Sequence, residues 1–416
     1  MHTPPRPAHA VRRAPADAPP QRSDVDGLRA WTVVAAATVA AAVGLGTVTS
    51  HGVLVAALLP LTIGGVGAGA ALVAISTTLQ FGLGPIVGRV TDRLGVQRVT
   101  LLAAGAFGAG AALAAASPHP TVGILTYAVG TGVAGACTLA PLVATVAGWC
   151  VRRRTAAIGI LSAGNGVGAL LLAPWLATAV DEQGLRTTWA LLALVGTGTL
   201  LLSAAALRTP PGAPTRASGS PGLLTDPALR RFYLAGALGS GGVIVSLAYL
   251  VPYAGSLGLS PTRAAALLGA TGAIGIVSRL ATSVVPARSA FRTYRVTQLV
   301  VAASGLAWVL APGDPRLLYV FVGVFGLGSG LWAALAPLVV AEAHPERLAS
   351  LLGVLYTSPA LGGAIGPLLA GVLLRCAPLA AVGSLLTVCL LLAHGVLRPL
   401  SKPLGPSAAP PNHEEV

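Results

Sequence analysis

Long apolar stretches recur along the whole chain and dominate its pattern. A membrane-spanning helix needs about 20 mostly apolar residues, and this length fits twelve segments. The sequence therefore predicts an all-α integral membrane protein with twelve transmembrane helices. The predicted spans are 30–58, 66–87, 99–116, 122–147, 155–177, 188–207, 232–255, 264–286, 296–311, 317–340, 348–374 and 378–397.

The longest interruption of the apolar pattern is residues 208–231, a polar segment rich in Pro, Gly and Ser. It divides the spans into six and six, which predicts two pseudo-repeated halves at 29–207 and 232–397 joined by a cytoplasmic linker. Residues 1–28 are rich in Pro, Arg, Ala and Asp, and the apolar run after them is too long for a signal-peptide core. We expect a disordered cytoplasmic tail at 1–28 and a second cytoplasmic tail at 398–416.

Composition supports the membrane assignment and explains the basic charge. The chain is 54% hydrophobic and 9% charged, whereas a soluble domain carries about 25% charged residues. The net charge of +14 would suggest nucleic acid only if it clustered on a soluble face. With the N-terminus inside, cytoplasmic segments hold 21 of the 26 Lys and Arg residues and outside loops hold four. The positive-inside rule then predicts a multi-pass protein of the cytoplasmic membrane, with both termini cytoplasmic and no nucleic-acid partner; we expect a monomer.

Residue clusters that would support catalysis or metal binding are missing from the sequence. The four cysteines are scattered with no CxxC pair, so neither zinc nor a disulfide framework is indicated. No HExxH, GxSxG or paired-carboxylate pattern occurs within an apolar segment, although intramembrane catalysis requires such groups. We expect no catalytic residue, metal or cofactor; a membrane-embedded enzyme or sensor is the least favoured alternative.

One polar loop carries a specific pattern. The stretch GRVTDRLGVQRV at 88–99 holds Gly88, Asp92, Arg93, Gly95 and Arg98 between two predicted spans. An acid beside arginines can pair across to a neighbouring helix end and latch one conformation. The stretch resembles the signature loop of the major facilitator superfamily, G-x-x-x-D-R-x-G-x-x-R. That resemblance implies the six-plus-six fold and a conformational latch in this tight turn.

Other stretches narrow the resemblance within that superfamily. They are DGLRAW (26–31), GWCVRRRTAAIGI (148–160), GNGVGALLLAPWL (164–176) and the segment 250–280. Together they resemble the prokaryotic branch of the monocarboxylate transporter family, over most of residues 26–397. The resemblance implies that an arginine in the eighth span, Arg279 here, binds the substrate.

Arg279 lies inside a predicted span, where a charge costs about 2.5–3.5 kcal/mol on insertion scales and normally faces a cavity or a partner. All twelve acids lie in tails or loops, except Glu342 at the cytoplasmic end of the span 317–340. An Arg fork binds a carboxylate through two parallel hydrogen bonds, so we expect a small organic anion as its counter-charge. In the alternative, Arg279 snorkels to the inner interface, since it lies about 15 residues, or roughly 22 Å, into its span.

The helical neighbours of Arg279 leave room beside its guanidinium. Gly272, Gly275, Thr282 and Ser283 are spaced so that they share its helix face. Animal members of the family carry an aspartate at the position of Gly275, and that aspartate is implicated in proton coupling. Its absence leaves this mode of coupling in doubt.

Other polar residues within the spans are candidates for the transport path. His51 stands where animal members of the family have a lysine that helps capture the anion, and histidine titrates near pH 6.5 in water. Hydroxyl groups of three tyrosines could line the path, although aromatic residues in helices more often pack or anchor at the interface. We also note three weaker polar candidates. The tyrosines are Tyr127, Tyr249 and Tyr356, and the weaker candidates are Asn165, Gln80 and Trp332.

Glycine-rich runs at 164–168 and 362–366 predict close helix packing that lets the two halves rock. The sequence therefore predicts secondary transport of a lactate- or pyruvate-like monocarboxylate by alternating access. Its partners would be the anion, the lipid bilayer and, in a proton-linked version, protons; uniport or exchange is the alternative to proton coupling. The alternative function is proton-driven efflux of drugs or metabolites. Such exporters usually carry an intramembrane acid and a G-x-x-x-G-P run, and GNGVGALLLAP at 164–174 lacks the Gly-Pro step.

Overall fold

The computed structural model describes residues 25–58, 65–210, 226–281, 289–343, 351 and 354–399. Regular secondary structure in these residues is helical throughout. Most of the predicted tails (1–28 and 398–416) and most of the predicted linker at 208–231 lie outside the described residues. The helices are α1 (Leu28–Thr49), α2 (His51–Leu58), α3 (Gly65–Gly82), α4 (Gly84–Leu94), α5 (Val96–Ala116), α6 (Pro120–Trp149), α7 (Arg154–Ala206), α8 (Pro227–Ser256), α9 (Pro261–Ala281), α10 (Ala290–Leu310), α11 (Leu317–Ala343), α13 (Ser358–Leu373) and α14 (Ala381–Leu397).

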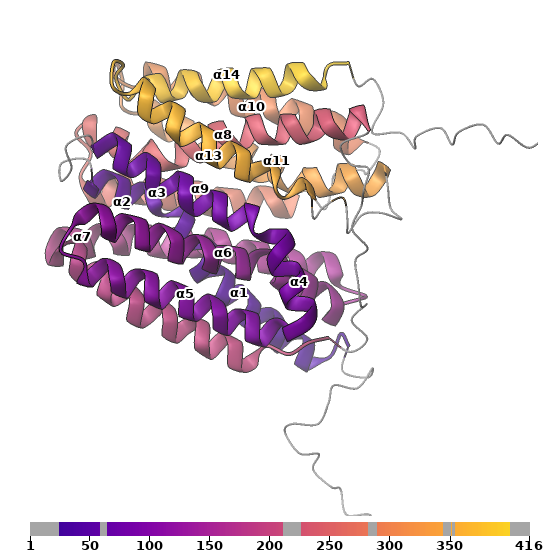
Figure 1. Ribbon diagram of the computed structural model, residues 1–416. Helices are drawn as coiled ribbons and strands as arrows, with labels where there is room; N and C mark the ends of the chain where they lie inside the picture. The colour runs from indigo at the N-terminus through magenta and orange to yellow at the C-terminus, as the bar shows by residue number, and fades with distance from the viewer. Residues whose placement is uncertain are drawn as a thin grey trace, which may run out of the picture.

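The helices form two bundles that lie side by side, with α1 to α7 in one and α8 to α14 in the other (Figure 1). The twelve predicted spans correspond to these helices when α1 with α2, and α3 with α4, each count as one span. The long helix α7 counts as two, because Gly184 (φ 80°, ψ 165°) joins two helical arms within it. The all-α, twelve-helix prediction is confirmed.

Helix length and hydropathy alone identify fewer membrane spans than the packing of the helices in the bundle does. By those criteria seven of the described helices can cross a membrane, or eight if the bent pair α3 and α4 is one span. Helices α13 and α14 are only 16 and 17 residues long within the described part of the chain. The bundle, rather than hydropathy, establishes that α10, α13 and α14 are spans, because each packs among the longer helices.

Two predicted spans are interrupted. The span 30–58 breaks at Ser50, whose N–H bonds to the carbonyls of Gly46 and Thr47 (3.0 and 3.1 Å). The span predicted to end at residue 87 instead bends by 49° between α3 and α4 and continues to Leu94. Glycines flank this bend and a proline follows in the first turn of α4. Glycine tolerates many backbone conformations, and proline lacks the N–H donor of a continuous helix, so both favour a break there.

Several ends differ from the predicted boundaries. Helices α8 and α10 begin five and six residues earlier than predicted, and the predicted loop between 177 and 188 is helical except at Gly184. The start of α1, the end of α14 and the helix α4 all lie at the same end of the bundle (Figure 1). This placement is what the predicted topology requires, while the assignment of that end to the cytoplasm stays a prediction.

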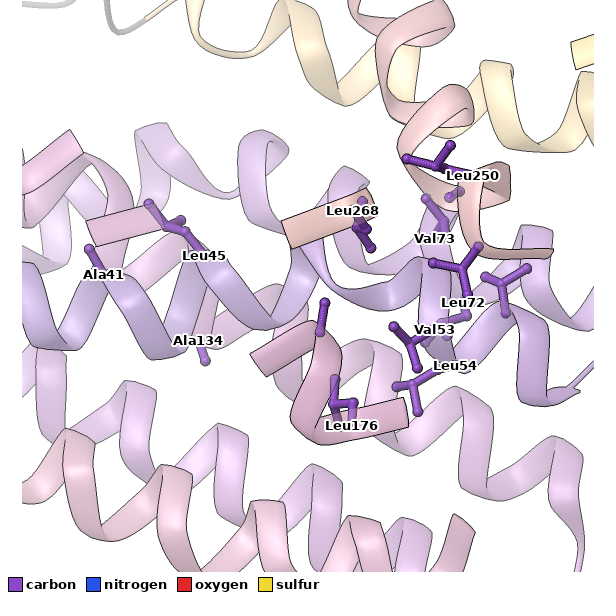
Figure 2. Packing of buried hydrophobic residues seen from close by; sticks show 14 of the residues in the cluster. Ala41, Leu45, Val53, Leu54, Leu72, Val73, Ala134, Leu176, Leu250 and Leu268 are labelled. Carbon is purple, nitrogen blue, oxygen red and sulfur yellow. The ribbon is translucent and has the colours of Figure 1, made fainter. Parts of the chain in front are cut away.

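The main apolar core crosses the boundary between the halves. Leu250 of α8 and Leu268 of α9 belong to the same buried cluster as Val53 of α2 and Val73 of α3 (Figure 2). A second cluster, around Phe232, lies within the C-terminal half. The two halves therefore share apolar packing around their common axis instead of being separate bodies.

Glycines set the close approach between helices, as the runs 164–168 and 362–366 predicted. A Cβ on Gly166 of α7 would lie 2.8 Å from the carbonyl oxygen of Gly272 in α9, and one on Gly363 of α13 would lie 2.8 Å from Thr77 Cβ in α3. A Cβ on Gly52 of α2 would lie 2.5 Å from a carbonyl oxygen of α8. Within the described residues, the halves thus meet chiefly through α7 with α9, α3 with α13, and α2 with α8.

Two stretches singled out in the sequence, 26–31 and 148–160, meet at one end of the N-terminal half. Asp26 has a left-handed backbone (φ 60°), and its carboxylate accepts the N–H of Arg152 at 3.1 and 3.2 Å. The N–H of Asp26 in turn donates to the carbonyl of Trp149 at 3.0 Å. The start of α1 is therefore fastened to the connection between α6 and α7.

Replacing a contact glycine should destabilise the N-terminal half. In Gly46→Ala, the new methyl group would lie 2.6 Å from Gly168 Cα in α7, and overpacking of this kind costs about 1–3 kcal/mol. We expect a lower melting temperature for the purified protein in detergent. Gly198→Ala is the matched control, because nothing lies within 4 Å of its added Cβ; equal melting temperatures for the two variants would contradict the packing.

Candidate functional site

A cavity of about 130 Å³ lies between the two halves, and we call it the inner cavity. Arg279 is the single ionisable side chain among the described residues that line it. Helices of both halves contribute to it, chiefly α7 from the first half and α9 and α11 from the second. The lining residues are Thr49, Asn165, Gly166, Ala169, Val243, Leu247, Thr271, Gly272, Gly275, Arg279, Phe325, Ser329, Gly330, Trp332 and Ala333.

The guanidinium of Arg279 reaches across the boundary between the halves. Its Nη1 donates to the carbonyl oxygen of Ser162 in α7 at 3.0 Å. This carbonyl can accept a second bond because Gly166, one turn further along, has no side chain to cover it. Gly272 and Gly275, predicted to share the face of Arg279, line the same cavity; Thr282 and Ser283 lie outside the described residues.

A second cavity of about 160 Å³, the outer cavity, adjoins the first. Three residues line both cavities: Thr49, Asn165 and Leu247. Its lining residues carry no formal charge when His51 is neutral: Val48, Thr49, His51, Gly52, Val73, Thr77, Gln80, Phe81, Asn165, Ile244, Leu247 and Ala248.

A polar pair stands where the cavities meet. Thr49 is the last residue of α1, next to the break at Ser50, and its hydroxyl lies 2.9 Å from Asn165 Oδ1 of α7 and 3.0 Å from its own helix carbonyl at Leu45. The break in the first span ends α1 at this residue. The wall between the two cavities is therefore made by a helix end and an amide, both of which can hydrogen-bond.

His51 begins α2 and is buried, with only 1% of its surface exposed. Its Nδ1 lies 3.1 Å from Ser76 Oγ in α3. The Ser76 hydroxyl also lies 2.7 Å from the carbonyl of Leu72, which has no proton to give and must accept it. Ser76 therefore accepts from Nδ1–H of His51, and the neutral ring keeps its lone pair on Nε2.

Two buried acceptors of the outer cavity's lining residues have no hydrogen-bond partner in the part of the chain that the structure describes. They are Nε2 of His51 and Oε1 of Gln80. Gln80 lies against Gly135 of α6, where an added Cβ would sit 3.0 to 3.1 Å from the side-chain atoms of Gln80. Buried polar atoms are normally hydrogen-bonded, so this pair indicates a binding function or a water site.

The three predicted tyrosines do not line either cavity. Tyr127 is fully buried between the rings of His51 and Trp189 (centroids 5.8 and 5.9 Å), and Tyr249 is fully buried in α8. Tyr356 lies in a turn before α13, 37% exposed, instead of inside a helix. Its phenol is within electrostatic range of the Arg279 guanidinium.

The predicted latch is mostly helical, not a loop. Gly88, Asp92 and Arg93 lie in α4, Arg98 lies in α5, and Gly95 (φ 80°) is the one residue that joins the two helices. The continuation of α3 into α4 shortened the turn that the sequence predicted over 88–99. Asp92, Arg93 and Arg98 are exposed at the end of the bundle, and their latch function stays a prediction.

The three weaker candidates from the sequence all lie at the cavities, as Arg279 and His51 do. Asn165, Gln80 and Trp332 all line a cavity. The indole ring of Trp332, on the inner cavity wall, stacks on the ring of Tyr294 with their centroids 5.9 Å apart. Isolated polar side chains within apolar helices were the available signal, because such residues usually face a cavity or the bundle interior.

Comparisons with known proteins identify the family of the chain. A family model described as Major Facilitator Superfamily matches residues 41–367. MFS transporter asaE of Aspergillus flavus is 24% identical over 377 residues, which cover 86% of this chain and 82% of that protein. Monocarboxylate transporter 11 of Homo sapiens is 32% identical over 265 residues, covering 58% of this chain and 55% of its own length. The chain thus aligns with little more than half of that transporter.

Solved structures support the fold. A crystal structure of the nucleoside transporter NupG superposes with a TM-score of 0.70 over 90% of this chain and 100% of that one. Its sequence is 13% identical, so the similarity concerns the fold alone.

Cysteine labelling can test the inner cavity. In a variant whose four native cysteines are replaced by alanine, we expect Ser329→Cys to react with a small water-soluble methanethiosulfonate in detergent, because Ser329 lines the cavity. Ser304→Cys is the matched control, since Ser304 is 3% exposed and lines neither cavity. Labelling of Ser329→Cys should be much the faster of the two; equal rates would argue against an accessible cavity.

Proposed function

We propose that this chain, which belongs to the Major Facilitator Superfamily, is a secondary transporter whose substrate is a small organic monocarboxylate of lactate or pyruvate size. Arg279 binds the carboxylate between the two halves, and the protein releases it by alternating access. One observation carries this proposal: the inner cavity lies between the halves, and among the described residues that line it Arg279 is the single ionisable one.

The charge of Arg279 and the volume of the inner cavity both favour a small anion as the substrate. No aspartate or glutamate is among the described residues that line the two cavities, and the guanidinium of Arg279 has the planar fork of donors that binds a carboxylate through two hydrogen bonds. Pockets for drug-sized ligands measure about 300–1,000 Å³, and the inner cavity holds about 130 Å³. In this conformation the site suits a molecule of few heavy atoms better than a bulky drug.

The position of Arg279 links binding to the movement of the halves. A guanidinium carries five N–H donors in a fixed fork, so one of them can hold Ser162 of the first half while others meet the carboxylate. Glycines bring α7 and α9 close together, with Gly166 facing Gly272 and the side chain of Ile276. Small residues at such a boundary suit the rocking of one half against the other around a fixed central site.

The relatives agree with this substrate class without fixing it. Monocarboxylate transporter 11 is named for such substrates, and the motifs at 148–160 and 250–280 resemble the prokaryotic branch of that family. Proton-driven efflux is less favoured, because the described cavity walls lack the intramembrane acid that such exporters usually carry.

Transport assays test the proposal directly. We expect saturable uptake of labelled lactate or pyruvate into proteoliposomes, from a panel that also contains acetate and oxalate. Arg279→Ala should abolish this uptake, because truncating one partner of a buried charge pair costs about 2–5 kcal/mol. Arg279→Lys should also fail, since lysine cannot form the bidentate fork.

Arg263→Ala provides the matched control, because Arg263 lies on the same helix, is exposed and lines neither cavity. It should transport normally. Near-normal uptake by correctly inserted Arg279→Ala would show that Arg279 does not bind the anion. Absence of uptake for every acid would make proton-driven efflux the favoured function.

Dependence on pH tests whether a proton accompanies the anion. Among the residues that line the cavities, His51 is the one whose side-chain type titrates between pH 5 and 8 in water. Proton-linked transport therefore predicts that His51→Gln removes the pH dependence of uptake across this range. A wild-type rate that stays constant from pH 5 to 8 excludes the proton-linked version and leaves uniport or exchange.

A further inference from the structure

Basic side chains gather where α10 begins and α14 ends, on the C-terminal half. The two helices pack along each other (Figure 1). At this end they meet the start of α8 in one buried apolar cluster, to which Phe232, Phe291 and Leu397 belong. The basic residues beside this cluster are Arg292 and Arg295 of α10, with His394 and Arg398 at the end of α14.

Helix geometry places these four side chains together. Arg295 follows Arg292 by three residues and Arg398 follows His394 by four, and such spacings put each pair on one face of its helix. Nη2 of Arg295 lies 3.5 Å from Nε2 of His394, across the contact between the helices. Arg398 is within electrostatic range of His394. The four residues therefore form one cluster, which we call the basic seam.

Arg295 is held between the two helices. Arginines near helix ends commonly extend their charge into water, and the exposed Arg292 and Arg398 are placed to do so. Arg295 is only partly exposed, and its Nε is buried with no hydrogen-bond partner in the described residues. Its charge therefore stays in the seam and adds to that of the two exposed arginines at the surface.

Acids do not neutralise the basic seam among the side chains that the structure describes. Neither α10 nor α14 contains an aspartate or a glutamate. From α8 onward, two acids have described side chains. Asp314 lies beyond the other end of α10, and Asp226 caps α8 by accepting the N–H of Ala228 at 2.8 Å. The three arginines thus attract an anion from outside this part of the chain.

Apolar side chains continue the surface of the seam along the two helices. Because α10 begins and α14 ends here, residues after Arg295 and before His394 lie deeper in the bundle. Val296 and Leu299 of α10 and Leu391 of α14 are exposed at that depth. Hydrocarbon surrounds the spans of a membrane protein, so these residues contact acyl chains. The basic seam lies directly beside them, where headgroups begin.

The corresponding seam of the N-terminal half differs. Its third and sixth spans are α5 and the second arm of α7, which also pack together. Arg98 is the one basic residue of α5, and α7 has none in its last turn. The charge bias that sets membrane topology therefore does not by itself require a cluster of this kind at α10 and α14.

We propose that the basic seam binds the headgroup phosphate of an anionic phospholipid, whose acyl chains lie over the exposed apolar residues of α10 and α14. Arginine forks bind phosphate oxygens through paired, charge-assisted hydrogen bonds, and basic pockets between membrane helices bind anionic headgroups. A zwitterionic lipid has the same phosphate, but its ammonium group would lie near three arginines. A lipid with a neutral alcohol in its headgroup, such as phosphatidylglycerol, fits better.

Lipid binding to the full-length protein in detergent tests the inference. Native mass spectrometry measures the binding of phosphatidylglycerol, of phosphatidylcholine with the same acyl chains, and of deacylated phosphatidylglycerol. We expect phosphatidylglycerol to bind about tenfold more tightly than phosphatidylcholine, since each arginine near an anionic headgroup raises the affinity by about fivefold. The deacylated headgroup should bind much more weakly than the intact lipid, because it has no chains to bury.

Matched variants locate the site. Arg292→Gln/Arg398→Gln should weaken phosphatidylglycerol binding by about tenfold or more, and Arg295→Gln by about fivefold. Arg152→Gln/Arg153→Gln is the matched control, because it removes the same charge from two exposed arginines at the connection between α6 and α7. It should bind phosphatidylglycerol as the wild type does. Equal melting temperatures without added lipid verify that the variants fold.

Each contrary outcome has a distinct meaning. Equal weakening in the seam double variant and in its matched control overturns the site and leaves a general attraction of lipid to basic surfaces. Unchanged binding in both seam variants overturns it as well. Equal binding of phosphatidylcholine, or of the deacylated headgroup, overturns the assignment to an anionic lipid. Transport is not measured in these experiments, so their failure would leave the proposed function standing.

Discussion

A guanidinium held between two membrane-embedded bundles is the constraint around which the central part of this structure is organised. Within a bilayer a charge needs polar partners, and Arg279 finds one in the backbone carbonyl of Ser162, which belongs to the opposite half. A backbone carbonyl is an acceptor that no substitution removes. The arginine therefore ties the two halves together through a backbone carbonyl.

This arrangement requires that helices approach one another closely at the same place. Gly166 leaves the Ser162 carbonyl uncovered and also allows α7 to approach α9 at Gly272. The same lack of side chains creates the inner cavity, since both glycines line it. Close packing, the polar contact and the binding space thus have one physical origin, the small residues at the boundary between the halves.

The Ser76 and Thr77 hydroxyls of α3 bond within their own helix, whereas Arg279 bonds across to the other half. In helices, serine and threonine hydroxyls donate to a carbonyl one turn earlier, as Ser76 and Thr77 do here. These bonds use the single proton of each hydroxyl and leave its lone pairs able to accept.

The amino-acid sequence by itself determined the class and the arrangement of the spans. Apolar length, the polar linker at 208–231 and the bias of cations predicted twelve helices in two halves, because burial in lipid depends on local composition. It also identified Arg279 as the residue of interest, since an intramembrane charge stands out without any knowledge of its neighbours. The glycine runs predicted close contacts for the same local reason.

Only the tertiary structure decided which polar residues share a cavity. The hydroxyl groups of Tyr127 and Tyr249 suited a transport path, yet both side chains are buried in packing, whereas Gln80 and Asn165 line the cavities. A helical pattern gives the face of a residue relative to its own helix, but not what the neighbouring helix places opposite that face. The breaks at Ser50 and at Leu83 set which residues of each span meet their neighbours.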